Sequence, residues 1–139
     1  MRTEEVERTQ MANEFIAAIA GCGRKFFSHN GEVSRLELDA RGRVWFIDKY
    51  SQKRIYTHYR YDWRGFTEGG TLRSLVSRLR DFIKTGKQVP RRAFWHDPSP
   101  HPDGDYWGYG PEDMAIVQRT ALSLGIVADS DLTAPTRTT

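Results

Sequence analysis

The sequence predicts a two-layer α+β domain, in which helices pack on one face of an antiparallel sheet. Apolar residues recur with a helical period in three segments, whereas the stretch from residue 25 to residue 61 alternates with a period of two. Hydrophobic residues make up 38% of the 139 residues, which is enough to bury one core and too many for a disordered chain. We expect a single domain over residues 1–127 and a flexible tail over residues 128–139.

The first helix is predicted from about Glu4 to Ala20. Thr3 can cap it, and the acidic residues of its first turn suit the positive end of the helix dipole. A glycine at position 21 or 23 can supply the left-handed residue that ends it. Its predicted buried stripe, which recurs at helical spacing, is Ala12, Phe15, Ile16 and Ile19.

A meander of three or four antiparallel strands is predicted over residues 25–61. Asn30-Gly31 is a strong hairpin signal, because both residues tolerate positive φ. A second turn ends at Gly42, which takes the left-handed position. The segment Val44–Ile47 is apolar on both faces, so we expect it to be a central strand with each face covered.

Two further helices follow the meander. The second helix is predicted over residues 71–85 with Gly86 after it, and the third begins at Pro111 and ends at Gly125. A loop rich in proline and aromatic residues, residues 90–111, separates them. We expect the first two helices to cover one face of the sheet, and the loop and last helix to cover its edge or its other face.

Charge is distributed unevenly along the chain. Residues 1–40 carry a net charge of −2, residues 41–92 carry +10, and residues 93–139 carry −5. A basic central segment favours partners such as phosphate backbones or acidic protein surfaces. Alternatively, the acidic ends balance the basic middle once the chain is folded.

A basic and aromatic surface is the first candidate site. Alternation along the last strand puts Arg54, Tyr56, His58 and Arg60 on one side, and Ile55, Thr57, Tyr59 and Tyr61 on the other. Arginine and tyrosine suit phosphates and unpaired bases, although they could equally be solubility charges and half-buried sheet residues. The predicted residues that contact nucleic acid or a protein partner are Arg41, Arg43, Lys49, Lys53, Arg54, His58, Arg60, Arg73, Arg80 and Lys84.

No enzymatic site emerges from the motifs. The loop residues His96, Asp97, His101 and Asp105 could serve a metal-dependent hydrolase, but their spacing matches no known ligand pattern. The segment Gly69–Thr71 lacks the lysine of a phosphate-binding loop. We therefore predict a non-enzymatic protein with no metal, no cofactor and no small-molecule substrate.

Cysteine content and hydropathy bear on location. The one cysteine, Cys22, excludes an internal disulfide bond. No apolar run approaches the roughly 20 residues of a membrane helix, and the acidic start is unlike a signal peptide. We therefore expect a cytoplasmic protein without membrane contact.

The motifs of the central region resemble those of a known group of proteins. The segments that carry the resemblance are residues 22–31, 42–48, 54–59, 65–72 and 79–83. They are similar to small, mostly uncharacterised proteins encoded on proteobacterial plasmids, prophages and integrative elements, over about residues 13–86.

The resemblance brings no catalytic residues, but it implies a mobile-element context inside a bacterial cell. Small single-domain proteins in that context often inhibit host defence systems or regulate transfer. Two hypotheses for the partner therefore stand beside each other. One is nucleic acid or a nucleoprotein complex, and the other is a host effector that an anti-CRISPR-like inhibitor occupies.

Overall fold

The computed structural model describes residues 3–22, 26–60, 63, 65–66, 70–90, 94 and 111–128. Within them the chain forms an α+β domain, as predicted. The proline-rich loop and the tail lie almost entirely outside the described residues. The elements are α1 (Thr3–Ala20), β1 (Ser28–His29), β2 (Glu32–Val33), β3 (Arg35–Leu38), β4 (Val44–Asp48), β5 (Lys53–Tyr56), α2 (Gly70–Thr85) and α3 (Pro111–Ser123).

The predicted meander divides into a sheet and a separate hairpin. Strands β3, β4 and β5 form an antiparallel sheet with β4 in the centre, as its two apolar faces predicted. In the register, Phe46 of β4 lies opposite Leu36 of β3 and Ile55 of β5. Among the described residues, strands β1 and β2 pair only with each other, around Asn30 and Gly31, whose φ values are 51° and 80°. That backbone is the one a tight hairpin turn requires.

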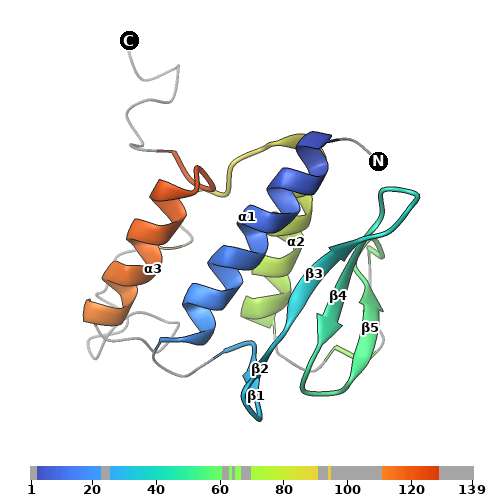
Figure 1. Cartoon of the computed structure of the whole chain (residues 1–139), viewed down its shortest axis with the longest axis horizontal. Coiled ribbons are helices and arrows are strands. Elements are labelled where there is room, and N and C mark those ends of the chain that lie inside the picture. Colours follow the sequence, from blue (N-terminus) through green and yellow to red (C-terminus); the bar gives the residue numbers. More distant parts are fainter. Residues whose placement is uncertain are drawn as a thin grey trace.

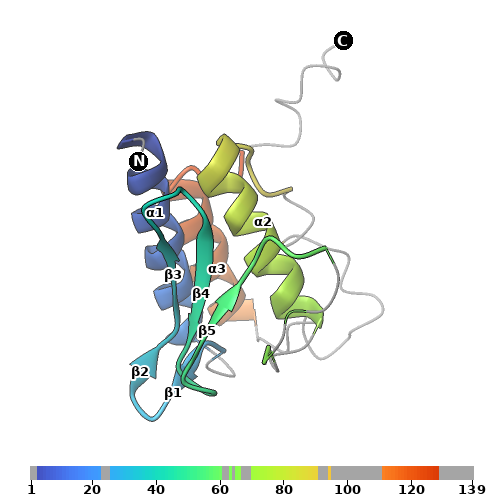
Figure 2. The ribbon, with the colours of Figure 1, turned by 90° about the vertical axis from the view of Figure 1, so that its right-hand side faces the viewer.

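The helices lie on one side of the sheet. Figures 1 and 2 show α1 and α2 against one face, and α3 against α1 on the side away from the sheet. The last helix was expected at the edge or the other face of the sheet, and that expectation is wrong. Its stripe of Met114, Val117 and Ala121 is buried, and α1 is the element against which α3 packs. No described helix covers the outer face of the sheet, which is the face turned away from α1 and α2.

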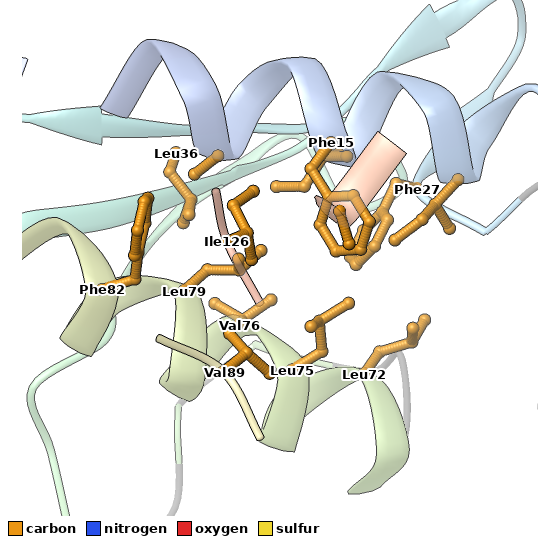
Figure 3. Packing of buried hydrophobic residues seen from close by; sticks show 14 of the residues in the cluster. Phe15, Phe27, Leu36, Leu72, Leu75, Val76, Leu79, Phe82, Val89 and Ile126 are labelled. Carbon is orange, nitrogen blue, oxygen red and sulfur yellow. The ribbon is translucent and has the colours of Figure 1, made fainter. Parts of the chain in front are cut away.

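The core lies between the helices and the inner face of the sheet. Figure 3 shows Phe15 of α1, Leu36 of β3 and Leu79 of α2 converging there, and all three are fully buried. Ile126 joins them after Gly125 reverses the chain with a φ of 73°. Its carbonyl accepts a hydrogen bond of 2.8 Å from the Val89 amide. Burying an aliphatic side chain of this size contributes about 1.5–3 kcal/mol.

The outer edge of β3 is closed by a side chain of α1. The Asn13 amide group donates to the Leu36 carbonyl at 2.9 Å and accepts from the Leu36 amide at 2.7 Å. An unpaired strand edge is a template for pairing with another chain, and this contact blocks it at its middle.

In the described part of the chain, no helix combines the length and apolarity needed to cross a bilayer.

Candidate nucleic-acid interface

The outer face of the sheet carries two rows of side chains set by the strand register. One row runs across the three strands through Glu37, Trp45 and Tyr56. The next row carries Arg35 of β3, Ile47 of β4 and Arg54 of β5. Side chains of residues that lie opposite each other on two paired strands are within contact distance. The face is therefore a mixture of aromatic rings and arginines, with a carboxylate at one edge.

Asp39, which follows β3, fixes two side chains of this face. Its carboxylate accepts hydrogen bonds from the Arg43 guanidinium at 2.8 Å and from the Trp45 indole at 2.9 Å. It also accepts from the backbone amides of Arg41 and Arg43, both at 2.9 Å. The Trp45 indole and these further donors hold the pKa of Asp39 well below its usual range, although burial opposes the shift. The turn thus presents Arg43 in one orientation.

Arg54 lies over the ring of Trp45, at the centre of the face. Its guanidinium carbon is 4.0 Å from the centroid of Trp45, which is a cation–π contact. Glu37 lies 3.5 Å from Arg54 and 3.5 Å from Arg35, so one carboxylate faces both arginines. All three side chains are more than a third exposed, and such ion pairs contribute little to stability. The guanidinium donors of Arg35 and Arg54 can therefore exchange partners at low cost.

Three aromatic rings form a line across β4, β5 and the residues that follow. Tyr56 lies 5.0 Å from Trp45 and 4.9 Å from Tyr59, measured between ring centroids. A shallow hollow of about 390 Å³ opens beside these rings, and Arg43 and Arg54 also line it. Tyr59 is 57% exposed. The line of rings therefore ends in a side chain that solvent reaches freely.

The prediction of Tyr59 from strand alternation is wrong. Tyr59 was predicted on the opposite side from Tyr56, yet the two rings meet at an interplanar angle of 74°. Strand β5 ends at Tyr56, so the period of two does not continue past it. The Tyr59 carbonyl accepts a hydrogen bond of 3.0 Å from the buried Trp63 indole, which holds the irregular segment in place.

Arg73 and Arg80 of α2 also bond the irregular segment that follows β5, residues 57–60. Arg80 donates to the Thr57 carbonyl and forms an ion pair of 3.0 Å with Asp81, and its side chain is only 18% exposed. Arg73 donates to the Arg60 carbonyl at 3.4 Å. These predicted binding residues therefore bond the backbone beside the aromatic line. A contact between them and an external partner remains a proposal.

Lys84, the third predicted cation of α2, joins three elements of the fold. Its ammonium lies 3.0 Å from the Glu5 carboxylate of α1 and donates to the Gly42 carbonyl at 2.5 Å. The Glu5 side chain is only 9% exposed, whereas that of Lys84 is 29% exposed. This pair shows one place where the acidic N-terminal region offsets the basic middle.

His58 completes the end of the sheet. Its Nε2 accepts a hydrogen bond of 3.0 Å from the Val44 amide, so the ring is neutral there. Burial lowers the pKa of His58, and the positive charges of Arg80 and Lys84 lower it further, while Asp81 and Asp39 act in the opposite sense. The ring also lies 5.3 Å from that of Tyr56. His58 therefore supports the face as an acceptor.

The other predicted cations lie at the two ends of the strands. Arg41 is exposed in the turn before β4, and Arg60 is exposed after β5. Lys49 and Lys53 flank the turn at the opposite end, where Lys49 is half-buried and Lys53 is exposed. The fold thus gathers Arg43, Arg54 and His58 around the aromatic line and leaves the four others around its periphery.

The prediction omitted the residues that organise the face. Trp45 was treated only as part of an apolar strand, and Asp39 as the end of a strand and the start of a turn. The polar turn beside an apolar central strand was the available signal, since the N–H group of a half-buried tryptophan commonly finds a hydrogen-bond acceptor nearby. The candidate metal ligands in the loop lie outside the described residues. Within the described residues no cluster of three potential ligands occurs.

These features define a small α+β domain whose sheet has one face of arginines and aromatic rings that no described helix covers. The model of the YoqU family matches residues 2–137, and the chain belongs to that family. No curated protein and no solved structure matches the chain.

Proposed function

We propose that this protein is a non-enzymatic accessory protein of a mobile element that binds nucleic acid through the outer face of its sheet. The observation that carries the proposal is the aromatic line framed by Arg43 and Arg54, over which no described helix lies. The resemblance of residues 13–86 to proteins of plasmids, prophages and integrative elements supports the mobile-element context.

The charge of the region favours a polyanion. Residues 35–60 hold seven basic and three acidic side chains, a net charge of +4 with neutral histidine. The planar guanidinium of arginine matches a phosphate group with two parallel donors. Glu37 pairs with Arg54, and Asp39 accepts a hydrogen bond from Arg43. A phosphate would therefore compete with these two carboxylates for the guanidinium donors.

The number of cations at the strands and turns sets the salt dependence of binding. The six are Arg41, Arg43, Lys49, Lys53, Arg54 and Arg60. If each neutralises one phosphate, log K falls with log salt at a slope of about −5 for a duplex and about −4 for a single strand. A slope near zero, or no binding at low salt, would contradict the proposal.

A double variant on the sheet face and a single control variant elsewhere test the proposal. Anisotropy of a labelled oligonucleotide of about 20 nucleotides is measured from about 50 to about 200 mM salt. Arg43→Gln with Arg54→Gln should weaken binding about tenfold at low salt and make the slope about 1.5 units shallower. Arg119→Gln on α3, exposed and distant from the sheet face, is the control and should leave both quantities unchanged. Equal effects of the two variants would refute an interface on the sheet.

A host effector protein is the second candidate partner, in an anti-defence role. The observation that favours it is Glu37, which sets a carboxylate between Arg35 and Arg54 on the exposed face. Protein interfaces commonly pair mixed charges around aromatic residues. A pull-down from bacterial lysate, with and without nuclease, separates the hypotheses. A specific effector that stays bound after nuclease treatment and is lost with the double variant would favour inhibition.

A further inference from the structure

We propose that the outer face selects single-stranded nucleic acid, by stacking an unpaired base in the corner formed by Tyr56 and Tyr59. The inference rests on the proposed function and narrows its ligand class. Phosphate contacts alone do not distinguish a single strand from a duplex, because both present the same charged backbone. The preference for a single strand over a duplex comes from the rings of Tyr56 and Tyr59, which can stack on an unpaired base.

The geometry of the two tyrosines suits one flat ring system. Their planes meet at 74° with centroids 4.9 Å apart, so a base lying on one ring turns its edge toward the other. The adjacent hollow of about 390 Å³ is within the size range of small-ligand pockets, at its lower end. Tyr59 is 57% exposed, so more than half of the residue is accessible to solvent and to a ligand.

The corner is held in place from behind. The Tyr59 carbonyl is bonded by Trp63, and the Thr57 hydroxyl donates to the Val44 carbonyl at 2.6 Å. Tyr56 also contacts the Trp45 ring, at 5.0 Å between centroids and an interplanar angle of 58°. A preorganised aromatic surface loses little entropy on binding, which raises affinity for a stacked base.

Charge at the rim of the hollow supplies the remaining recognition. The Arg43 guanidinium carbon is 5.8 Å from the Tyr56 ring centroid, and Arg54 lies over Trp45 on the same face. A base in the corner would bring its neighbouring phosphates toward these two cations. A duplex keeps its bases stacked inside, so it can use the cations but not the rings.

Ring substitutions at Tyr59 test the inference on the full chain. Tyr59→Leu removes the ring, Tyr59→Phe keeps it, and Tyr50→Leu is the control, since Tyr50 is 59% exposed on the turn between β4 and β5. The probes are a labelled oligothymidine, its uridine counterpart and a duplex of the same length, each of about 20 nucleotides. Anisotropy titrations over a range of salt give an affinity and a slope for each.

The expected result has two parts. Tyr59→Leu should weaken single-strand binding about tenfold, while Tyr59→Phe and Tyr50→Leu change it less than about twofold. The salt slope should stay unchanged with Tyr59→Leu, because no phosphate contact is lost.

Two outcomes contradict the inference and are distinguishable from each other. Equal binding of single strand and duplex by the wild type, with no effect of Tyr59→Leu, would overturn base stacking and leave the proposed function standing. Absence of binding to all three probes at low salt would overturn the proposed function as well.

Discussion

Lys84 offers the sharpest test of how the basic middle of the chain is used. Its ammonium contacts the Glu5 carboxylate at 3.0 Å and the Gly42 carbonyl at 2.5 Å, and so ties α2 to α1 and to the turn between β3 and β4. Lys84→Met keeps the aliphatic stem and removes the ammonium. Glu5, with its side chain 9% exposed, then loses its cation, and the Gly42 carbonyl loses its donor.

The magnitude follows from burial. Breaking a fully buried ion pair costs about 3–5 kcal/mol, whereas an exposed pair contributes at most about 1 kcal/mol. This pair lies between the limits, because Glu5 is covered and Lys84 is 29% exposed. We expect Lys84→Met to lower the free energy of unfolding by about 2 kcal/mol. For a chain of this length, that corresponds to a melting temperature lower by about 6–10 °C.

Urea unfolding followed by tryptophan fluorescence measures the effect. Lys87→Met is the matched control, because Lys87 is exposed just beyond the same helix, and it should change stability by less than about 0.5 kcal/mol. Adding Glu5→Gln to Lys84→Met should restore part of the loss, since a neutral amide costs less to bury than an unpaired carboxylate. If Lys84→Met unfolds at the same urea concentration as Lys87→Met, the tie does not stabilise the fold.

The remaining predictions concern pH and the sheet edge. Because the pKa of His58 is lowered in the fold, this histidine takes up a proton more readily in the unfolded chain, so stability should fall as the pH drops below about 6.5. His58→Gln keeps an acceptor for the Val44 amide, so its urea midpoint should vary less with pH than that of the wild type. The same pH dependence of the midpoint in both proteins would contradict this. The lowered pKa of Asp39 gives a contribution that is full above a pH of about 4 and is lost below it. Asp39→Asn should therefore be less stable than the wild type at neutral pH, with a difference that narrows in acid; a constant difference would count against it. Asn13→Ala removes both hydrogen bonds to Leu36 and should lower the free energy of unfolding, measured in urea, by about 2 kcal/mol. A decrease of less than about 0.5 kcal/mol would contradict a stabilising contact at the strand edge.

The helices and the first hairpin were predictable because local signals specify them. The stripe from Ala12 to Ile19 needs only a helical period, and α1 was predicted within one residue of its observed start. Asn30-Gly31 needs only its tolerance of positive φ. The central position of β4 followed from its lack of a polar face. Each of these properties is carried by residues close together in the chain.

The packing of the C-terminal region was less predictable. The stripe of α3 indicates that one face is buried, but it does not indicate against which element. Ile126 and Val127, at the predicted end of the domain, pack into the core because Gly125 turns the chain back toward Val89. Contacts of this kind join residues far apart in sequence, and no local period encodes them.

The candidate site was predictable in composition and less so in arrangement. The sequence placed cations and tyrosines in the meander, and Arg43 and Arg54 do frame the aromatic line. It could not show that Arg80 and Lys84 bond backbone carbonyls, since those carbonyls belong to distant segments. The position of Tyr59 was missed because the strand ends before it.

Photochemical crosslinking tests the central claim most directly, since it locates the bound strand. A single strand carrying a halogenated pyrimidine is irradiated with the full chain, digested with trypsin and mapped by mass spectrometry. The proposal predicts adducts in two tryptic peptides: residues 55–60, with Tyr56 and Tyr59, and residues 44–49, with Trp45. The peptide of residues 50–53, with the equally exposed Tyr50, should carry fewer adducts than these two, because its cation Lys53 contacts phosphate and not a base. Adducts confined to peptides other than the predicted two, or no adducts at low salt, would contradict an interface on the sheet.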